Sequence, residues 1–270
     1  MDAQRRLWFA TQTQSMDTGM GTNVKEQIDL ATLVDSIANL RPGERRVEIS
    51  IPQHISASSA KIVVGGSGTA LETRQFEDMA WLASTRMRDE FGPVLGVSRI
   101  RLEGKGDGDE GEAESERTRK SLAEGSLQRE WNLKAYTARL AFETPHLSLP
   151  FEVYEAVIAA VPGGVEYVWF SEATKYEPRL PCGLVTTLPS IVVDLNGGDG
   201  KRGQVTVRPE QYAMRIGERA TGDGEGAMCA LLVERIGGAR GSREVGLGWS
   251  AFRGRRVVLD WDAGFVGIGR

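Results

Sequence analysis

The 270-residue chain is long enough to bury a large hydrophobic core, in one domain or in two unequal ones. Its 37 acidic and 33 basic side chains give a formal net charge of -4, so nothing suggests a nucleic-acid partner, which needs a concentrated basic face. Because the chain has only 2 His and 2 Cys, it offers little for a metal site or a catalytic histidine network, and we expect no cofactor.

Targeting signals give little guidance about the compartment. No run of about eighteen apolar residues occurs, so we expect no membrane-spanning helix. The first ten residues, Met1–Ala10, hold no apolar stretch long enough for a secretory signal, which taken literally predicts a chain that is not exported. A fragment or a mature form would lack such a signal in any case, so the compartment stays open.

Short β-branched segments recur along the chain between turns rich in Gly, Pro and Asp. Several of them alternate apolar with polar residues, which is typical of half-buried antiparallel strands. The predicted strands are Val47–Ile51, Lys61–Val64, Val94–Leu102, Ser190–Leu195, Gln204–Val207, Ala230–Val233 and Arg256–Asp260. Many short strands at close spacing predict a mainly β fold, built as a barrel or a sandwich.

Helical signals are few. Apolar residues at helical spacing predict a helix over Lys25–Leu40, which Arg41-Pro42-Gly43 would end. A short helix is predicted from Phe151 to Ile158, and the stretch Phe76–Arg88 is a third candidate.

The stretch Lys105–Gln128 differs in kind, because a run of glycine and acidic residues leaves it almost nothing apolar to bury. Such a composition does not offset the entropy lost on ordering. The sequence therefore predicts a mobile, solvated insertion here, in preference to an acidic recruitment tail.

The triplet Asp17-Thr18-Gly19 matches the motif that aspartic peptidases carry once in each of two lobes, where two carboxylates share a proton and activate water. In those enzymes a buried apolar strand leads into the Asp, and Thr or Ser follows the Gly. Here the polar segment Thr11–Ser15 precedes the triplet and Met20 follows it. We interpret the region as a turn and Asp17 as a weak catalytic candidate.

The segment Leu140–Val157 resembles the second active-site segment of pepsin-like aspartic peptidases, where Asp-Thr/Ser-Gly-Thr leads through apolar residues to a Pro and a short helix. Aligning Thr144 with the final Thr of that motif puts Ala141, Phe142 and Glu143 at the Asp, Thr/Ser and Gly positions. Ala141 carries neither charge nor proton, and Glu143 lies two positions away from the Asp position. The resemblance therefore implies a degraded second Asp motif.

Further segments extend this resemblance over most of the chain by their order and spacing. They are similar to the inter-lobe strand, the strand pair after it, the late hairpin with its Pro-x-x-Tyr continuation, the closing Leu-Gly turn and the final strands. In that order they are Ser56–Gly66, Phe91–Leu102, Leu188–Val193 with Val207–Tyr212, Val245–Phe252, and Val257–Asp262 with Val266–Gly269.

Within the family the chain most resembles the plant-type branch that includes xylanase-inhibitor-like proteins. In that branch the second Asp motif is commonly degraded ahead of a Pro-aromatic pair, as at Pro145-His146. The resemblance also implies that Cys182 and Cys229 form the disulfide of the C-terminal lobe. Two buried free thiols, as in a reducing compartment, are the alternative.

Two further polar segments are considered as binding sites. The segment Asp194–Gly200 is interpreted as a hairpin turn, since its spacing does not fit a calcium loop. Arg253, Arg255 and Arg256 stand near Trp249 and are interpreted as a solvated turn in preference to an anion site.

The resemblance implies a mainly β, pepsin-like double-layer lobe with a few short helices over residues 46–270. Residues 1–45 would then be the remnant of an N-terminal lobe. An exposed apolar face is expected where that lobe would pack. Either another chain, a protein partner or the missing lobe, covers this face, or residues 1–45 fold differently from the family and hide it.

Members of that branch bind and block glycoside hydrolases without proteolysis of their own. The resemblance thus implies a catalytically inactive binding module, inhibitory towards a secreted hydrolase and located outside the cell or in a vacuole. One alternative is an aspartic endopeptidase, or half of one, completed by another chain and using Asp17 or Glu143 in an unorthodox role. A structural subunit or a gene remnant without activity is the other.

Overall fold

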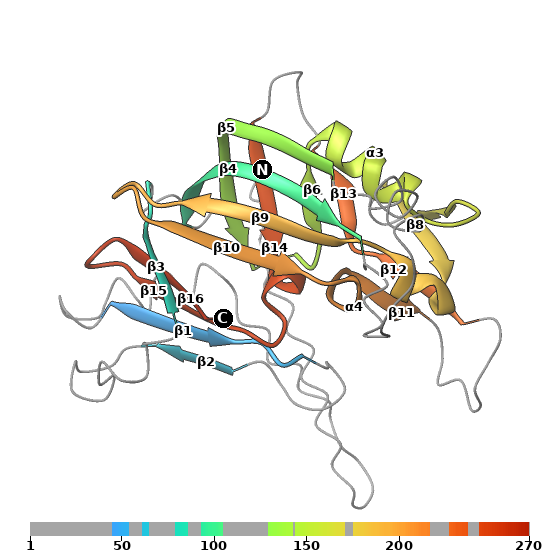
Figure 1. The fold of residues 1–270 in the computed structure, drawn as a ribbon. Coiled ribbons are helices and arrows are strands. Elements are labelled where there is room, and N and C mark those ends of the chain that lie inside the picture. Colours follow the sequence, from blue (N-terminus) through green and yellow to red (C-terminus); the bar gives the residue numbers. More distant parts are fainter. Residues whose placement is uncertain are drawn as a thin grey trace, which may run out of the picture.

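The computed structural model describes residues 45–53, 61–64, 79–85, 93–104, 129–142, 144–170, 175–216, 227–236 and 243–269. Within these ranges the chain is mainly β, as the recurring β-branched segments predict (Figure 1). Several predicted features lie outside the described residues: the helix over Lys25–Leu40, the insertion over Lys105–Gln128, and the side chains of Asp17 and Glu143. The division at residue 45 stays a prediction.

A seven-stranded sheet forms the centre of the fold. Its strands, in spatial order, are β10 (Arg202–Val207), β9 (Ser190–Asn196), β4 (Val94–Glu103), β5 (Arg129–Ala141), β14 (Glu244–Gly248), β6 (Leu147–Leu149) and β13 (Val233–Arg235). Strand β14 lies between β5 and β6, and it runs parallel to β5 and antiparallel to β6. Two strands that follow one another in the chain are thus separated by a strand from much later in the sequence.

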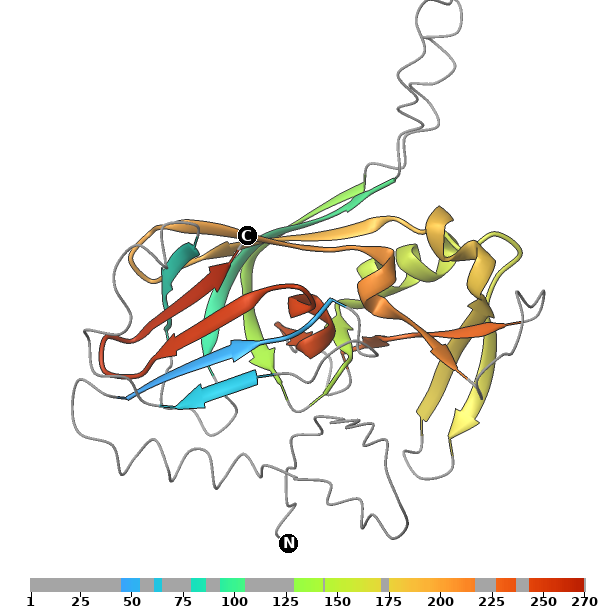
Figure 2. The ribbon, with the colours of Figure 1, turned by 90° about the horizontal axis from the view of Figure 1, so that it is seen from below.

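A five-stranded antiparallel sheet lies at one end of the central sheet, and a four-stranded sheet lies at the other end (Figures 1 and 2). The five-stranded sheet has the order β2 (Lys61–Val64), β1 (Arg46–Ser50), β15 (Arg256–Asp260), β16 (Phe265–Gly269) and β3 (Met79–Ala83). The four-stranded sheet has the order β11 (Ala213–Ile216), β12 (Met228–Leu231), β8 (Lys175–Pro181) and β7 (Glu166–Phe170).

Helices are short in the described part of the chain. They are α3 (Phe151–Ala159), α4 (Pro209–Tyr212) and the 3₁₀ helices η2 (Cys182–Thr187) and η3 (Trp249–Phe252). Helix α3 confirms the helix predicted from Phe151 to Ile158, and its inward face buries Val153, Ala156 and Val157. None of the helices in the described ranges has the length and apolar character needed to cross a membrane.

Two predictions of local structure are wrong. The stretch Phe76–Arg88 does not form a helix over Met79–Ala83, because pairing with β16 makes this segment strand β3 and buries Leu82 completely. The strand predicted over Ala230–Val233 is interrupted at Leu232, where the chain leaves β12 and enters β13 in a different sheet. Hydrogen bonds of Leu232 to Tyr212 and Leu147 hold that crossing point.

One continuous hydrophobic core joins the three sheets. It includes fully buried residues of the five-stranded sheet, such as Val47, of the central sheet, such as Leu140, and of the four-stranded sheet, such as Leu180. Tyr212 is also fully buried, and its hydroxyl donates a 2.6 Å hydrogen bond to the carbonyl oxygen of Pro189. The described residues therefore fold around a shared interior.

Candidate functional site

The segment that resembles an active-site loop connects β5 to β6 in the middle of the central sheet. Ala141 ends β5, lies opposite Gly248 of β14 and is 1% exposed. The carbonyl oxygen of Thr144 accepts a 2.9 Å hydrogen bond from the Trp249 N–H, and that of His146 accepts a 3.1 Å bond from the Gly248 N–H. The loop is therefore fastened to the beginning of η3.

Gly248 is the position at which the backbones come closest. A Cβ atom added there would contact the carbonyl oxygen of His146, and it would lie 2.6 Å from that of Thr144 and 2.7 Å from the carbonyl carbon of Pro145. These contacts are with backbone atoms, which cannot rotate out of the way as a flexible side chain does. Only glycine fits between the loop and β14 without displacing one of them.

Apolar packing occupies the place next to Ala141. The Phe142 ring packs against the Phe252 ring with 5.3 Å between their centroids, and Phe252 is fully buried. None of the described loop residues is acidic. At the described residues Ala141 and Phe142 the structure thus shows core packing.

Thr144 and His146 form a small polar contact within the same loop. The Thr144 hydroxyl lies 3.1 Å from His146 Nδ1 and accepts a 3.2 Å hydrogen bond from the His146 backbone N–H. This contact closes the turn before β6. Of the predicted site residues, the structure therefore places Ala141, Phe142 and Thr144 together, while Glu143 and Asp17 lie outside the described residues.

Cys182 and Cys229 form a disulfide, as the family resemblance implies. Their sulfur atoms are 2.06 Å apart and their Cα atoms 5.0 Å apart. The bridge joins the start of η2 to β12, and Cys229 is buried. The alternative of two free thiols is excluded by this bond.

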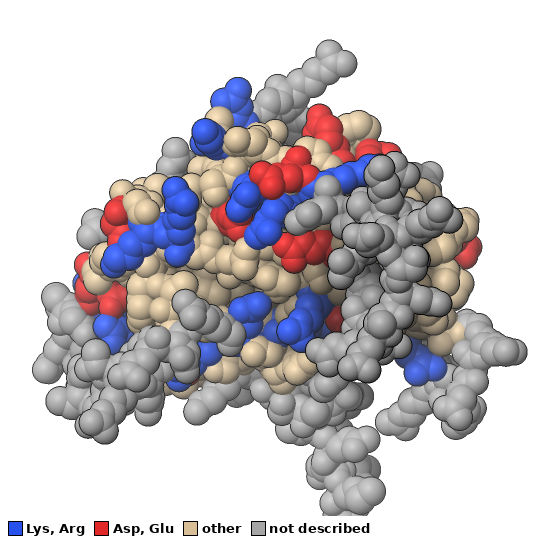
Figure 3. All heavy atoms as spheres, viewed as in Figure 1, with Lys and Arg blue, Asp and Glu red and all other residues tan. Residues whose placement is uncertain are grey.

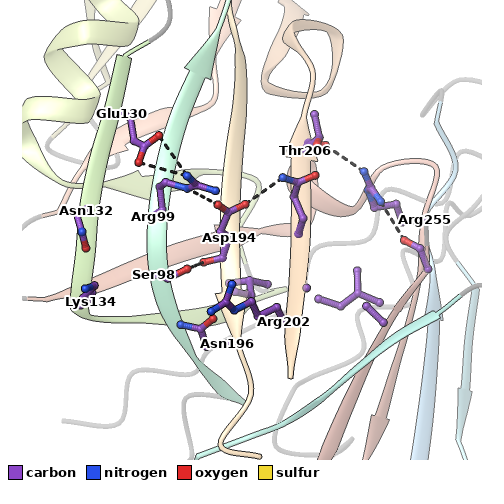
Figure 4. A pocket seen from close by; sticks show the side chains of 16 residues that line it. Ser98, Arg99, Glu130, Asn132, Lys134, Asp194, Asn196, Arg202, Thr206 and Arg255 are labelled. Carbon is purple, nitrogen blue, oxygen red and sulfur yellow. Dashed lines mark hydrogen bonds and ion pairs between the residues drawn. The ribbon is translucent and has the colours of Figure 1, made fainter. Parts of the chain in front are cut away.

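A second candidate site, not predicted from the sequence, is a hollow of about 980 Å³ on the outer face of the central sheet. Its polar walls come from β5, β4, β9 and β10, and its far end reaches β3 and β16 (Figure 4). Seen from the side of Figure 1, basic and acidic side chains lie next to one another on this face (Figure 3). Metal binding is not indicated, since no group of His, Cys, Asp and Glu in the described ranges is arranged to hold an ion.

Asp194 is the centre of the hydrogen bonds in this hollow. Its carboxylate accepts a 2.6 Å bond from Arg99 Nε, a 3.0 Å bond from the Gln204 amide and a 3.4 Å contact from Arg101. Arg99 also donates to both carboxylate oxygens of Glu130 at 3.3 Å. Burial by itself raises the pKa of Asp194, but the hydrogen bonds from Gln204 and Arg99 and the nearby guanidinium charges together hold the pKa below its ordinary value.

The lowered pKa of Asp194 gives a pH dependence of stability. Since the folded-state pKa lies below that of the unfolded chain, the carboxylate stabilises the fold above about pH 4, the ordinary aspartate value, and this contribution is lost as the pH falls through the folded pKa. Asp194→Asn should therefore lower the free energy of unfolding at neutral pH, and its difference from wild type should shrink in acid. Urea unfolding of both proteins across this range measures the difference, and a difference independent of pH would contradict the prediction.

The interpretation of the arginine cluster as a solvated turn is wrong for Arg253. This side chain is 7% exposed, stacks over the Trp249 ring at 5.2 Å and donates a 3.0 Å hydrogen bond to the carbonyl oxygen of Glu210. Burial lowers the pKa of the Arg253 guanidinium from its ordinary value. Arg255 likewise donates to the carbonyl oxygens of Thr206 and Gly269. Both arginines fasten η3 and the strands beside it.

Asp194 belongs to strand β9, as the predicted strand Ser190–Leu195 implies, and the turn expected over Asp194–Gly200 starts later in the chain. The turn begins after Asn196, where the Gly197 N–H bonds to the Lys201 carbonyl oxygen, and it connects β9 to β10. Gly200 has a positive φ of 80°, which favours glycine there. The hairpin is confirmed, with its strands longer than expected.

Comparison with known proteins assigns the chain to no family. No protein-family model matches the sequence, and no curated protein is similar to it at a significant level.

Proposed function

We propose that this chain is a pepsin-like protein that lacks a working pair of catalytic aspartates and acts as a binding module. The observation that carries the proposal is the place of Ala141. It stands at the Asp position of the motif that the loop resembles, it is 1% exposed, and the residue after it, Phe142, packs its ring against Phe252. A carboxylate is needed at that position to share a proton and activate water with its counterpart.

The arrangement of β14 supports the pepsin-like class. The segments Leu140–Val157 and Val245–Phe252 resemble two separate parts of the family sequence, and the structure brings them together by the pairing of β14 with both β5 and β6. The bond between Cys182 and Cys229 agrees with the disulfide that the resemblance implies. These are long-range relations, which agreement in local sequence alone does not produce.

An assay of acid proteolysis tests the proposal. We expect the purified chain to leave a quenched fluorescent peptide and a denatured protein substrate intact at acidic pH, and to show no binding of a statine-type inhibitor. The physical reason is that a single carboxylate cannot both deprotonate water and present a proton to the peptide carbonyl. An active aspartic peptidase, assayed in parallel, is the control for substrate and inhibitor.

The alternative, an endopeptidase completed by another chain, predicts the opposite result. Acid proteolysis that is blocked by the statine-type inhibitor and abolished by Asp17→Asn would overturn the non-catalytic proposal. The variant Asp199→Asn is the matched control, because Asp199 lies in the exposed β9–β10 turn and should leave any such activity unchanged.

For the partner, we propose a secreted glycoside hydrolase, as in the branch that the sequence most resembles. The test is titration of the chain against a set of secreted xylanases, with the rate of substrate hydrolysis and co-elution in size-exclusion chromatography as readouts. Inhibition that reaches completion at a one-to-one ratio supports the proposal. If every hydrolase in the set keeps its full activity and none co-elutes with the chain, the inhibitory role is rejected. That result would not affect the proposed lack of proteolysis, which the acid-proteolysis assay tests separately.

A further inference from the structure

Two neighbouring rows of side chains cross the outer face of the central sheet at the hollow, and they differ in how their charges are balanced. The first row has one residue on each of the strands β5, β4, β9 and β10, namely Asn132, Arg99, Asp194 and Gln204. Each residue is the register partner of the next one in the row. The guanidinium and carboxylate of this row neutralise one another through the bonds described above.

The second row carries positive charge that no described side chain neutralises. Arg202 of β10 pairs with Asn196 of β9, and Asn196 pairs with Gly96 of β4. Lys134 lies on the same face of β5, two positions after Asn132, and both Lys134 and Arg202 are exposed. Neither cation forms an ion pair or a hydrogen bond with the described part of the chain. Figure 4 shows Lys134, Asn196 and Arg202 at this end of the hollow. Lys134 stands beside the row, because the β5 partner of Gly96 is Thr137.

The residues that line the whole hollow also carry more positive than negative charge. Its charged lining residues are four cations, Arg99, Lys134, Arg202 and Arg255, and two carboxylates, Glu130 and Asp194. Two positive charges are therefore unbalanced. A hollow that concentrates charge of one sign attracts a ligand of the opposite sign.

The spacing of the two free cations indicates what kind of anion fits. From β5 to β10, three strand-to-strand steps separate Lys134 from Arg202 by about 14 Å across the sheet. The offset of Lys134 along β5 adds to this distance, and the two long side chains can reach over the difference. In an extended peptide, side chains four positions apart lie on one face at a separation of about 13 Å. Two carboxylates at that spacing would each meet one cation.

The groups between the cations suit a peptide backbone. The amides of Asn132 and Asn196 each offer a donor and an acceptor, which is the pairing that a peptide group requires. Nucleic acid fits less well, because two carboxylates line the same hollow and none of its described lining residues is an aromatic that could stack on a base.

We propose that this hollow binds an extended acidic peptide segment of a partner protein. Lys134 and Arg202 pair with two of its carboxylates, and Asn132 and Asn196 hydrogen-bond its backbone. The proposal does not rest on the absence of peptidase activity, and the two can fail separately.

Fluorescence anisotropy with the full chain tests the proposal. The probe is a labelled peptide of alternating Glu and Ser, and the comparison peptide carries Gln in place of every Glu. We expect the Glu peptide to bind with an affinity that falls as salt is added, and the Gln peptide to bind at least tenfold more weakly, since exposed charge pairs are screened by salt.

Paired variants locate the binding. Lys134→Gln combined with Arg202→Gln should weaken binding of the Glu peptide by about tenfold, which corresponds to two partly exposed charge pairs. Arg215→Gln combined with Arg243→Gln removes two exposed cations that do not line the hollow, and it should leave the affinity unchanged. Circular dichroism of both double variants confirms that the fold is retained.

Three results would overturn the proposal: equal affinity in the two double variants, equal affinity for the Glu and Gln peptides, or no detectable binding of the Glu peptide at low salt. A fourth measurement separates a peptide site from a simple anion site. If inorganic phosphate displaces the peptide at the same total charge concentration, the hollow recognises single anions and the peptide assignment is wrong.

Discussion

Replacing both cysteines, as Cys182→Ser with Cys229→Ser, should lower the free energy of unfolding by about 4 kcal/mol. The bridge closes a loop with a sequence separation of 47, and removing it gives the unfolded chain back the conformations that the cross-link forbids. Denaturation in urea without reductant measures the change for wild type and the double variant.

Removing the bridge should loosen the four-stranded sheet in particular, in addition to lowering the free energy of unfolding of the whole chain. Cys229 of β12 pairs with Leu180 of β8 on one side and with Arg215 of β11 on the other, so the bond ties an inner strand of the four-stranded sheet to the start of η2. Wild type with reductant is the control, and its unfolding midpoint should approach that of the double variant. Equal midpoints for oxidised wild type and the double variant would contradict the prediction.

Phe252→Ala should cost a similar amount, about 4 kcal/mol, because it removes a large, fully buried side chain and leaves a cavity. Phe252 is fully buried and packs against Phe142, and η3 around it is held by the buried Arg253. Thermal and urea unfolding measure the loss. Phe151→Ala is the matched control: this ring is 51% exposed at the start of α3, and its removal should cost less than about 1 kcal/mol.

A double-mutant cycle with Phe142→Ala then isolates the contact between the two rings. We expect a coupling energy of about 1 kcal/mol, typical of an aromatic pair. Strictly additive losses would show that the two rings are buried independently, which would weaken the assignment of the loop beside Ala141 to the core.

The positions of most strands could be predicted from the sequence, but the pairing of strands that lie far apart in the chain could not. The alternation in segments such as Val94–Leu102 follows from burial of one face of the sheet, and the structure confirms it. Strand β3 was missed because its short segment Met79–Ala83 has no clear alternation, and its partner β16 lies far away in the chain. Pairing over such distances outweighs local preference.

The hollow was missed for a related reason. Arg99 and Asp194 are separated by 95 positions, and each by itself looks like an ordinary solvated residue of an alternating strand. The register of β4 with β9 makes them partners. One signal was available in the sequence: Asp194 is the only polar residue in the run Ile191–Leu195, which suggests a specific partner.

The loop at Ala141 and the arginines near it differ in how far the sequence predicts their surroundings. The absence of an Asp at Ala141 was visible in the sequence, but the burial of Arg253 was not, since three nearby arginines are usually solvated. The fold provides carbonyl oxygens and the Trp249 ring to hold that guanidinium. These partners of Arg253 become apparent only once the position of η3 in the fold is known.

The insertion of β14 between β5 and β6 has a consequence for how the protein is made. On the ribosome, β5 and β6 emerge about a hundred residues before Glu244–Gly248, and until then the edges that β14 will occupy stay unpaired. High contact order of this kind slows folding. Nascent chains that stall before β14 should thus be the aggregation-prone species, and a chaperone that shields strand edges should raise the yield more than a slower rate of translation does.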